Sequence, residues 1–94
     1  MKQDSKGREL LRQIIDETPK DLKKQLHYSD AIAIKLDGML KQRNMSQRDL
    51  ARSTGKTEAE VSRWLGGTHN FTLRTLAKIS VVLGEDLIQI KAKL

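Results

Sequence analysis

Two capping boxes in the middle of the chain constrain its fold more than any other feature. In each box a hydroxyl residue precedes an acidic residue by three positions, Ser46 before Asp49 and Thr57 before Glu60. Such a pair satisfies the free backbone N–H groups at a helix start. Gly55 lies between the boxes and is typical of a left-handed residue that ends a helix. The pattern predicts two short helices, about 47–54 and 58–66, joined by a tight turn.

Apolar residues at helical spacing predict further helices on both sides of this pair. We expect a helix over residues 5–17, in which Leu10, Leu11, Ile14 and Ile15 form an apolar stripe. This stripe is typical of a core face and equally of a helix that docks on a partner. Thr18-Pro19 then predicts a new helix start, with Thr18 as its cap.

Ser29 is expected to cap the next helix, over about 30–43, and Thr72 to cap a helix over 73–83 that Gly84 ends. With few residues that break helices, the chain is predicted to be all-α. The residues expected to face the core are Ile32, Leu36, Met39, Leu40, Leu50, Ala51, Val61, Leu73, Leu76, Ala77, Ser80 and Leu83.

The period of the pattern changes near the C-terminus. Ile88, Ile90, Ala92 and Leu94 alternate with polar residues, which predicts a short β-strand over 88–94. A lone strand needs a partner, and no other segment has a strand pattern, so we expect it to pair with a second copy as a dimer contact. A disordered tail and a helical extension are the alternatives.

Composition excludes several classes of protein. The chain has 94 residues, enough for one domain, and no cysteine, so disulfides and thiolate metal sites are excluded. Three aromatic residues are too few for a base-stacking platform. His27 and His69 are far apart in sequence, and no cofactor loop or acid–base pair appears, so we expect neither metal, nor cofactor, nor enzyme activity. No apolar run suits a membrane span or a signal peptide, so the expected compartment is cytoplasmic.

The strongest basic segment of the chain is residues 41–56, which includes the first short helix and the turn after it. The chain has a net charge of +6, and residues 41–56 hold five basic side chains against Asp49 alone. An anionic partner would bind such a segment, although a solvated helix face has the same composition. Small Ala51 allows close helix packing, and Val61 fixes the second helix on the first. This is helix-turn-helix geometry, in which the second helix enters a DNA major groove, unless it is an αα-corner of an unrelated bundle.

Several stretches in order resemble the Cro/cI-repressor-like (XRE) helix-turn-helix family. They are Met45-Ser46-Gln47-Arg48-Asp49-Leu50-Ala51, Gly55, Val61-Ser62-Arg63-Trp64-Leu65-Gly66-Gly67 and Phe71-Thr72-Leu73-Arg74-Thr75-Leu76-Ala77. The resemblance implies a compact lambda-repressor-like bundle of five helices, of which four can be placed in this sequence. It divides the chain into an N-terminal helical extension (1–29), a DNA-binding domain (30–87) and the C-terminal strand (88–94). The last stretch and the added N-terminal helical segment look most like HigA-type antitoxins, which bind a small RNase toxin and repress their own operon.

The resemblance also implies which residues contact double-stranded DNA. Gln47 should contact a phosphate and brace the second helix, and Arg48 belongs to the same set. The positions that face base edges or the adjacent backbone are Lys56, Thr57, Glu58, Ala59, Ser62 and Arg63, and those of the loop that grips the second strand are Thr68, His69, Asn70 and Thr72. Arg63 would pair with a guanine edge, and Ala59 would touch a thymine methyl. Glu58 either accepts from a cytosine amine or weakens binding, and Trp64 is expected to pack under the loop.

These features favour a sequence-specific repressor that binds an inverted repeat as a homodimer. The rival hypothesis is a protein-interaction antitoxin that mainly masks a toxin and binds DNA secondarily.

Overall fold

The computed structural model describes residues 2–91. For residues 2–6 and 15 it describes the backbone alone. Its helices are α1 (Lys2–Glu17), α2 (Lys20–Gln42), α3 (Gln47–Thr54), α4 (Glu58–Leu65) and α5 (Leu73–Leu83). Between residues 2 and 91 there is no β-strand. The predicted all-α class is therefore confirmed for this part of the chain.

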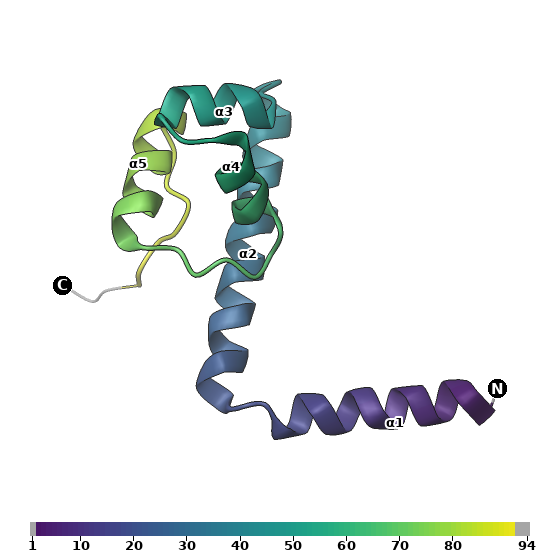
Figure 1. Cartoon of the computed structure of the whole chain (residues 1–94). Helices are drawn as coiled ribbons and strands as arrows, with labels where there is room; N and C mark the ends of the chain where they lie inside the picture. The colour runs from purple at the N-terminus through teal and green to yellow at the C-terminus, as the bar shows by residue number, and fades with distance from the viewer. Residues whose placement is uncertain (1, 92–94) are drawn as a thin grey trace.

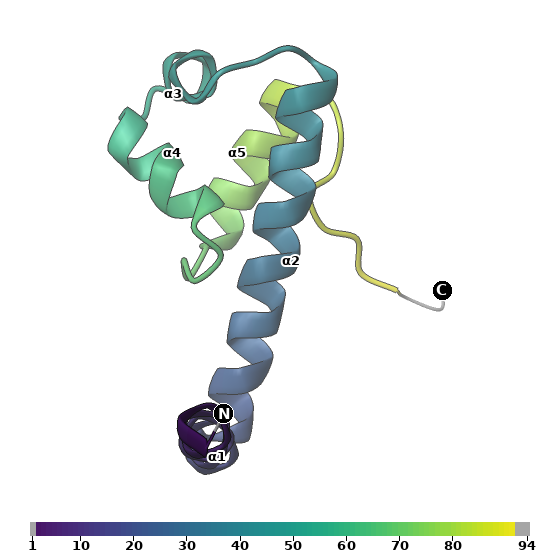
Figure 2. The ribbon, with the colours of Figure 1, turned by 90° about the vertical axis from the view of Figure 1, so that its right-hand side faces the viewer.

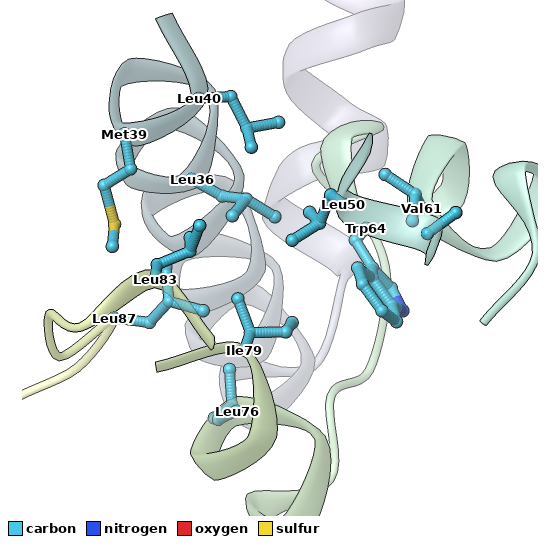
Figure 3. Packing of buried hydrophobic residues seen from close by; sticks show 11 residues of the cluster. Leu36, Met39, Leu40, Leu50, Val61, Trp64, Leu76, Ile79, Leu83 and Leu87 are labelled. Carbon is cyan, nitrogen blue, oxygen red and sulfur yellow. The ribbon is translucent and has the colours of Figure 1, made fainter. Parts of the chain in front are cut away.

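Helices α3, α4 and α5 pack against the C-terminal half of α2 and form a small body, while α1 lies apart from it (Figure 1). The core is apolar and continuous across the four elements (Figure 3). Leu36 of α2, Leu50 of α3, Val61 of α4 and Ile79 of α5 are each 0% exposed. Trp64 is also buried, at 3% exposed, as its predicted packing role requires. Burial of these side chains is the main source of the body's stability.

Helix α2 is continuous through Ser29, so the prediction that Ser29 caps a helix is wrong. Ser29 is buried, and its hydroxyl donates a hydrogen bond to the backbone carbonyl of His69, 2.6 Å away. A serine hydroxyl suits either role, because it can cap its own helix or bond to a neighbouring segment. The helix also runs across the predicted boundary at residues 29–30.

The connection between α1 and α2 differs from the prediction in its cap. Pro19 itself occupies the N-cap position of α2 and makes no side-chain cap bond. The Thr18 hydroxyl donates instead to the carbonyl of Ile14, 2.8 Å away in the last turn of α1. Proline has no N–H and disfavours a helical residue before it, so one helix ends here and another begins. As a result, α1 runs across the end of α2 rather than continuing it (Figure 2).

Helix α5 presents only part of the predicted face to the core, because Leu76 and Leu83 are buried as predicted but Ile79 takes the place of Leu73 and Ala77. Leu76, Ile79 and Leu83 are buried, whereas Leu73 is 74% exposed and Ala77 is exposed. Apolar residues occupy positions nearly all around this helix, so the pattern alone does not fix its rotation. Gly84 ends the helix in a left-handed conformation, with φ of 70°, as predicted.

Two contacts tie the segment after α5 back to the body. The Glu85 carboxylate pairs with Lys35 at 2.9 Å and with Arg43 at 3.0 Å, both on or next to α2. Leu87 is 5% exposed in the core, and its backbone N–H donates to the Ser80 hydroxyl at 3.1 Å. The chain therefore crosses from α5 to α2 before it reaches the segment that was expected to be a strand.

The predicted strand is wrong for residues 88–91, which are irregular. The alternation placed Ile88 and Ile90 in an interface, but they are 37% and 82% exposed, and Leu87 enters the core instead. The segment lies beside helix α2 on the side away from α4 (Figure 2). The remaining positions of the predicted strand, 92–94, lie outside the described residues.

Candidate nucleic-acid interface

Helix α3 begins at a complete capping box. The Ser46 hydroxyl accepts a hydrogen bond from the Asp49 N–H at 3.0 Å, and the Asp49 carboxylate accepts from the Ser46 N–H at 2.8 Å. The Ser46 N–H holds the pKa of Asp49 below its usual value, because it stabilises the charged carboxylate. Both predicted features, the cap and the buried Leu50 and Ala51, are confirmed. Gln47 and Arg48 are exposed in the first turn.

The turn between α3 and α4 is held by its own backbone and by one buried hydroxyl. Gly55 is left-handed, with φ of 70° and ψ of 25°, as predicted. The Lys56 N–H then donates back to the Ala51 carbonyl at 2.9 Å. Thr54 is 1% exposed, and its hydroxyl donates to the Leu50 carbonyl at 2.7 Å. These bonds fix the direction in which the chain leaves α3, and hence the direction of α4.

Helix α4 begins at the second capping box. The Glu60 N–H donates to the Thr57 hydroxyl at 3.1 Å, and the Glu60 carboxylate accepts from the Thr57 N–H at 2.8 Å. That N–H lowers the pKa of Glu60 from its usual value. The Glu60 carboxylate therefore serves as the acceptor of the capping box.

The side chains of α4 divide cleanly into an inner and an outer arc. Val61 and Trp64 point into the core beside Leu50 (Figure 3). The outer arc consists of exposed side chains, namely Glu58, Ala59, Ser62 and Arg63. At 100° per residue these four positions span less than half a turn, so they lie on one continuous strip. Helix α4 lies at the edge of the body opposite the C-terminal segment (Figure 2), which leaves this strip open to a partner.

Basic residues are also exposed on α3 and in the turn that leads to α4. Arg48 and Arg52 are four residues apart on the exposed side of α3, and Lys56 is exposed in the turn. With Arg63 they give four basic groups, against the carboxylates of Asp49, Glu58 and Glu60. Of the predicted DNA contacts, Gln47 and Arg48 lie on α3, Lys56 and Thr57 lie in the turn, and Glu58, Ala59, Ser62 and Arg63 lie on α4. The structure adds Arg52, which was not among the predicted contacts although its i+4 spacing from Arg48 is visible in the sequence.

The loop between α4 and α5 carries the other predicted contacts. Thr68, Asn70 and Thr72 are exposed, and the Thr72 hydroxyl caps α5 by accepting from the Thr75 N–H at 3.1 Å. The His69 ring is half-buried and meets the Phe71 ring edge-on, with centroids 4.7 Å apart.

The same loop is bonded to α2 through Ser29 and approaches α2 closely at Gly67. Ser29 donates to the His69 carbonyl, as described above. Gly67 has a φ of 90°, and a Cβ at this position would come within 3.1 Å of the Asp30 carboxylate. No sequence pattern could have identified this fixation, because Ser29 and the loop are forty residues apart.

A family model for the Cro/C1-type HTH DNA-binding domain matches residues 35–90. This is more than half of the chain. The protein belongs to the Cro/C1-type HTH family. The match covers α3, α4, α5 and the C-terminal part of α2, which form the body, and leaves α1 and the start of α2 outside. Membership supports a DNA-binding regulator. Neither the comparison with curated proteins nor the comparison with solved structures gave a match.

Among the residues that the structure describes, no group of three or more His, Cys, Asp or Glu side chains is placed to hold a metal ion. Of the helices within residues 2–91, none has the length and apolar character needed to cross a membrane.

Proposed function

We propose that this Cro/C1-type HTH protein is a sequence-specific transcriptional repressor whose α4 enters the DNA major groove. The observation that supports this role best is the outer arc of α4. Four adjacent exposed side chains on a helix that is capped and anchored at Val61 and Trp64 form a rigid reading surface. A major groove admits one α-helix, and such a helix presents its exposed side chains to the base edges.

Within that surface the proposed contacts have different tasks. Arg63 donates two hydrogen bonds to a guanine edge, and Ala59 packs on a thymine methyl. Lys56, Thr57 and Ser62 contact base edges or the phosphates beside them. Glu58 carries the opposite charge to the rest, and in the proposed complex it accepts from a cytosine amine.

Phosphate contacts would fix the register of α4 without reading sequence. Gln47 and Arg48 at the start of α3 hold one strand. Residues of the 68–72 loop hold the other strand, through Thr68, His69, Asn70 and Thr72. The His69 ring is partly engaged with Phe71, so its backbone and its exposed neighbours are better placed for this contact than the ring itself.

The proposed repressor acts as a homodimer on an inverted repeat. Two copies related by a two-fold axis would place their α4 helices in successive major grooves, about 34 Å apart. A single copy with four basic groups around α4 neutralises few phosphates, so a second copy is needed for tight binding at physiological salt.

Selection from a random-sequence duplex library tests this function. The protein is expected to enrich an inverted repeat whose half-sites are separated by about one helical turn. The variant Arg63→Ala serves as the matched control, because Arg63 is exposed and its loss leaves the core intact. Absence of any enriched motif, at a salt concentration where the protein still binds duplex DNA, would contradict the proposal.

A second candidate function is that of an antitoxin that binds a small RNase toxin and represses its own operon. The supporting observation is the helical extension, since α1 and the first part of α2 lie outside the matched family region. Co-expression with the product of the adjacent gene tests this role. A stable complex that releases RNase activity when the antitoxin is removed supports it, and separate elution of the two proteins contradicts it.

A further inference from the structure

A pocket of about 580 Å³ opens where α2, α5, the 68–72 loop and the C-terminal segment meet. Its volume falls within the range of about 300–1,000 Å³ that small-molecule sites occupy. The C-terminal segment, which forms part of its wall, lies beside α2 on the side away from α4 (Figure 2). We call this site the α2 pocket. No residue of α4 lines it, so it is separate from the proposed DNA-reading strip.

One part of the α2 pocket is apolar and belongs to the edge of the core. Leu76 and Leu87 are 6% and 5% exposed, and Ile32 and Phe71 pack against the same core. These four side chains come from α5, the C-terminal segment, α2 and the loop, so the pocket forms only when all four segments are packed together. An apolar surface of this kind suits the apolar body of a small molecule.

The other part of the α2 pocket carries hydrogen-bonding groups. They are the side-chain amides of Gln25, Asn70 and Gln89 and the hydroxyl of Tyr28. None of these four side chains makes a hydrogen bond to another described residue. Each group can both donate and accept, so together they suit a carbonyl or amide group of a ligand.

The charge of the lining indicates the charge of the ligand. Among the described residues no charged side chain lines the α2 pocket, although 32% of the chain is charged. Two other hollows on α5 differ in this respect, because Glu85 and Asp86 line one, and Arg74 and Lys78 line the other. A charged ligand in the α2 pocket would lose hydration without gaining an ion pair. The pocket therefore fits an uncharged ligand.

The wall formed by the loop connects the α2 pocket to DNA binding. Asn70 and Phe71 line the pocket, and so does Ser29, whose hydroxyl donates to the His69 carbonyl at 2.6 Å. We propose that the pocket binds an uncharged small molecule with an apolar body and a carbonyl or amide group, and that this molecule holds the loop against α2. A ligand that binds only the docked loop raises the population of that state. The proposal rests on the repressor proposed above, in which the same loop contacts phosphate, and gives that repressor an effector site.

The dye Nile red tests the α2 pocket, because it is uncharged, carries a carbonyl group and fluoresces strongly in apolar surroundings. Titration of the full-length protein should show saturable binding of one dye per chain. An anionic anilinonaphthalene sulfonate dye should not displace Nile red, even though the protein has a net charge of +6.

A matched pair of charge substitutions locates the bound dye. Gln25→Glu puts a carboxylate into the pocket with little change of shape, whereas Gln42→Glu makes the same change on the same helix at an exposed position outside the pocket. Gln25→Glu should weaken Nile red binding roughly tenfold, because the dye would remove water from the carboxylate, and Gln42→Glu should leave it unchanged. Ile14→Gln should also leave it unchanged, which distinguishes the pocket from the exposed apolar stripe of α1.

Ser29→Ala tests whether the ligand and the docked loop support each other. Loss of the bond to His69 loosens the docked loop, so the variant should bind Nile red at least about twofold more weakly. Saturating dye should in turn raise the affinity of the wild type for duplex DNA by about fivefold, the lower end of the coupling found between linked sites. The same dye concentration should have a smaller effect on Gln25→Glu.

Three results would overturn the site. The first is a full-length protein that binds no dye at concentrations from monomer to dimer, as when a second copy or the chain's own end occupies the pocket. The second is equal binding by Gln25→Glu and Gln42→Glu, and the third is displacement of Nile red by the anionic dye.

Failure of the effector role and failure of the proposed function give different results. Dye binding in the pocket that leaves DNA affinity unchanged would refute the effector role and leave the repressor as proposed. Dye binding in the pocket of a protein that selects no DNA motif would refute the repressor and leave the ligand site.

Discussion

Substitution of Ser29 by alanine removes the one side-chain hydrogen bond described between α2 and the loop that precedes α5. The Ser29 hydroxyl is buried and donates to the His69 carbonyl at 2.6 Å. Alanine fits the helix interior and has a higher helix propensity than serine, so the substitution does not strain α2 itself. Any loss of stability then reports on the contact with the loop.

The expected loss of stability depends on how deeply the His69 carbonyl is buried. A buried acceptor left without a partner costs about 1–3 kcal/mol, and His69 is only partly buried. Part of this cost is offset by the higher helix propensity of alanine, which is worth a few tenths of a kcal/mol. We therefore expect a loss of about 1–2 kcal/mol in the free energy of unfolding. For a domain of this size that lowers Tm by roughly 4–16 °C.

Equilibrium urea unfolding followed by circular dichroism measures this loss. The matched control is Ser53→Ala, because Ser53 also donates to a backbone carbonyl, that of Asp49 at 2.9 Å, but on an exposed surface within its own helix. The control should change stability by less than about 0.5 kcal/mol. Protein concentration is kept equal in all samples, since dimerisation makes apparent stability depend on it.

If Ser29→Ala unfolded with the same midpoint as Ser53→Ala, the loop would not be held by this bond. The fixation of Thr68 and Asn70 for phosphate contact would then need another cause. With the bond as described, the variant should also bind duplex DNA more weakly at temperatures where it remains folded.

Three further predictions concern the buried core, the salt dependence of DNA binding and the ion pairs of Glu85. Ile79→Ala, at a side chain of α5 that is 0% exposed, should cost about 2–5 kcal/mol of unfolding free energy, whereas Leu73→Ala on the same helix, 74% exposed, should cost less than about 0.5 kcal/mol. Equal costs would contradict the observed rotation of α5. The logarithm of the duplex association constant should fall by about 0.9 per phosphate contact for each decade of salt, and a slope near zero would contradict phosphate binding. Hydrogen bonds from Lys35 and Arg43 lower the pKa of Glu85 below its usual 4.5, so these two ion pairs stabilise the protein above that pH, and their contribution is lost as the pH falls through the pKa of Glu85 in the folded protein. Glu85→Gln should therefore reduce the loss of stability in acid. An unchanged dependence of stability on pH would show that the ion pairs of Glu85 are not formed.

Features that depend on a few neighbouring residues could be predicted from the sequence. Both capping boxes and the left-handed Gly55 are local, because each is completed within three or four residues. The packing roles expected of Val61 and Trp64 are confirmed, since both side chains are buried. Together these features specify the helix-turn-helix unit and therefore the outer arc of α4.

Features that depend on segments far apart in the sequence could not be predicted in the same way. Ser29 bonds to a residue forty positions away, and its hydroxyl has the same chemistry in a cap. The rotation of α5 was ambiguous because Leu73 and Val81 are as apolar as the buried Ile79. The alternation near the C-terminus indicated a strand, but residues 88–91 are irregular, and Leu87, which lies outside the alternating set, is the residue that enters the core.

The central claim is that α4 reads DNA sequence through Arg63, and one affinity ratio tests it most directly. The ratio compares a duplex carrying the selected inverted repeat with a scrambled duplex of equal length, for the wild type, Arg63→Ala and Gln47→Ala. A two-bond contact to a base is worth roughly 1–3 kcal/mol, and a symmetric dimer loses it twice. Arg63→Ala should therefore reduce the ratio at least tenfold, while Gln47→Ala weakens binding to both duplexes alike and leaves the ratio unchanged. A ratio for Arg63→Ala within twofold of the wild type would contradict the assignment of α4 as the reading helix through this residue.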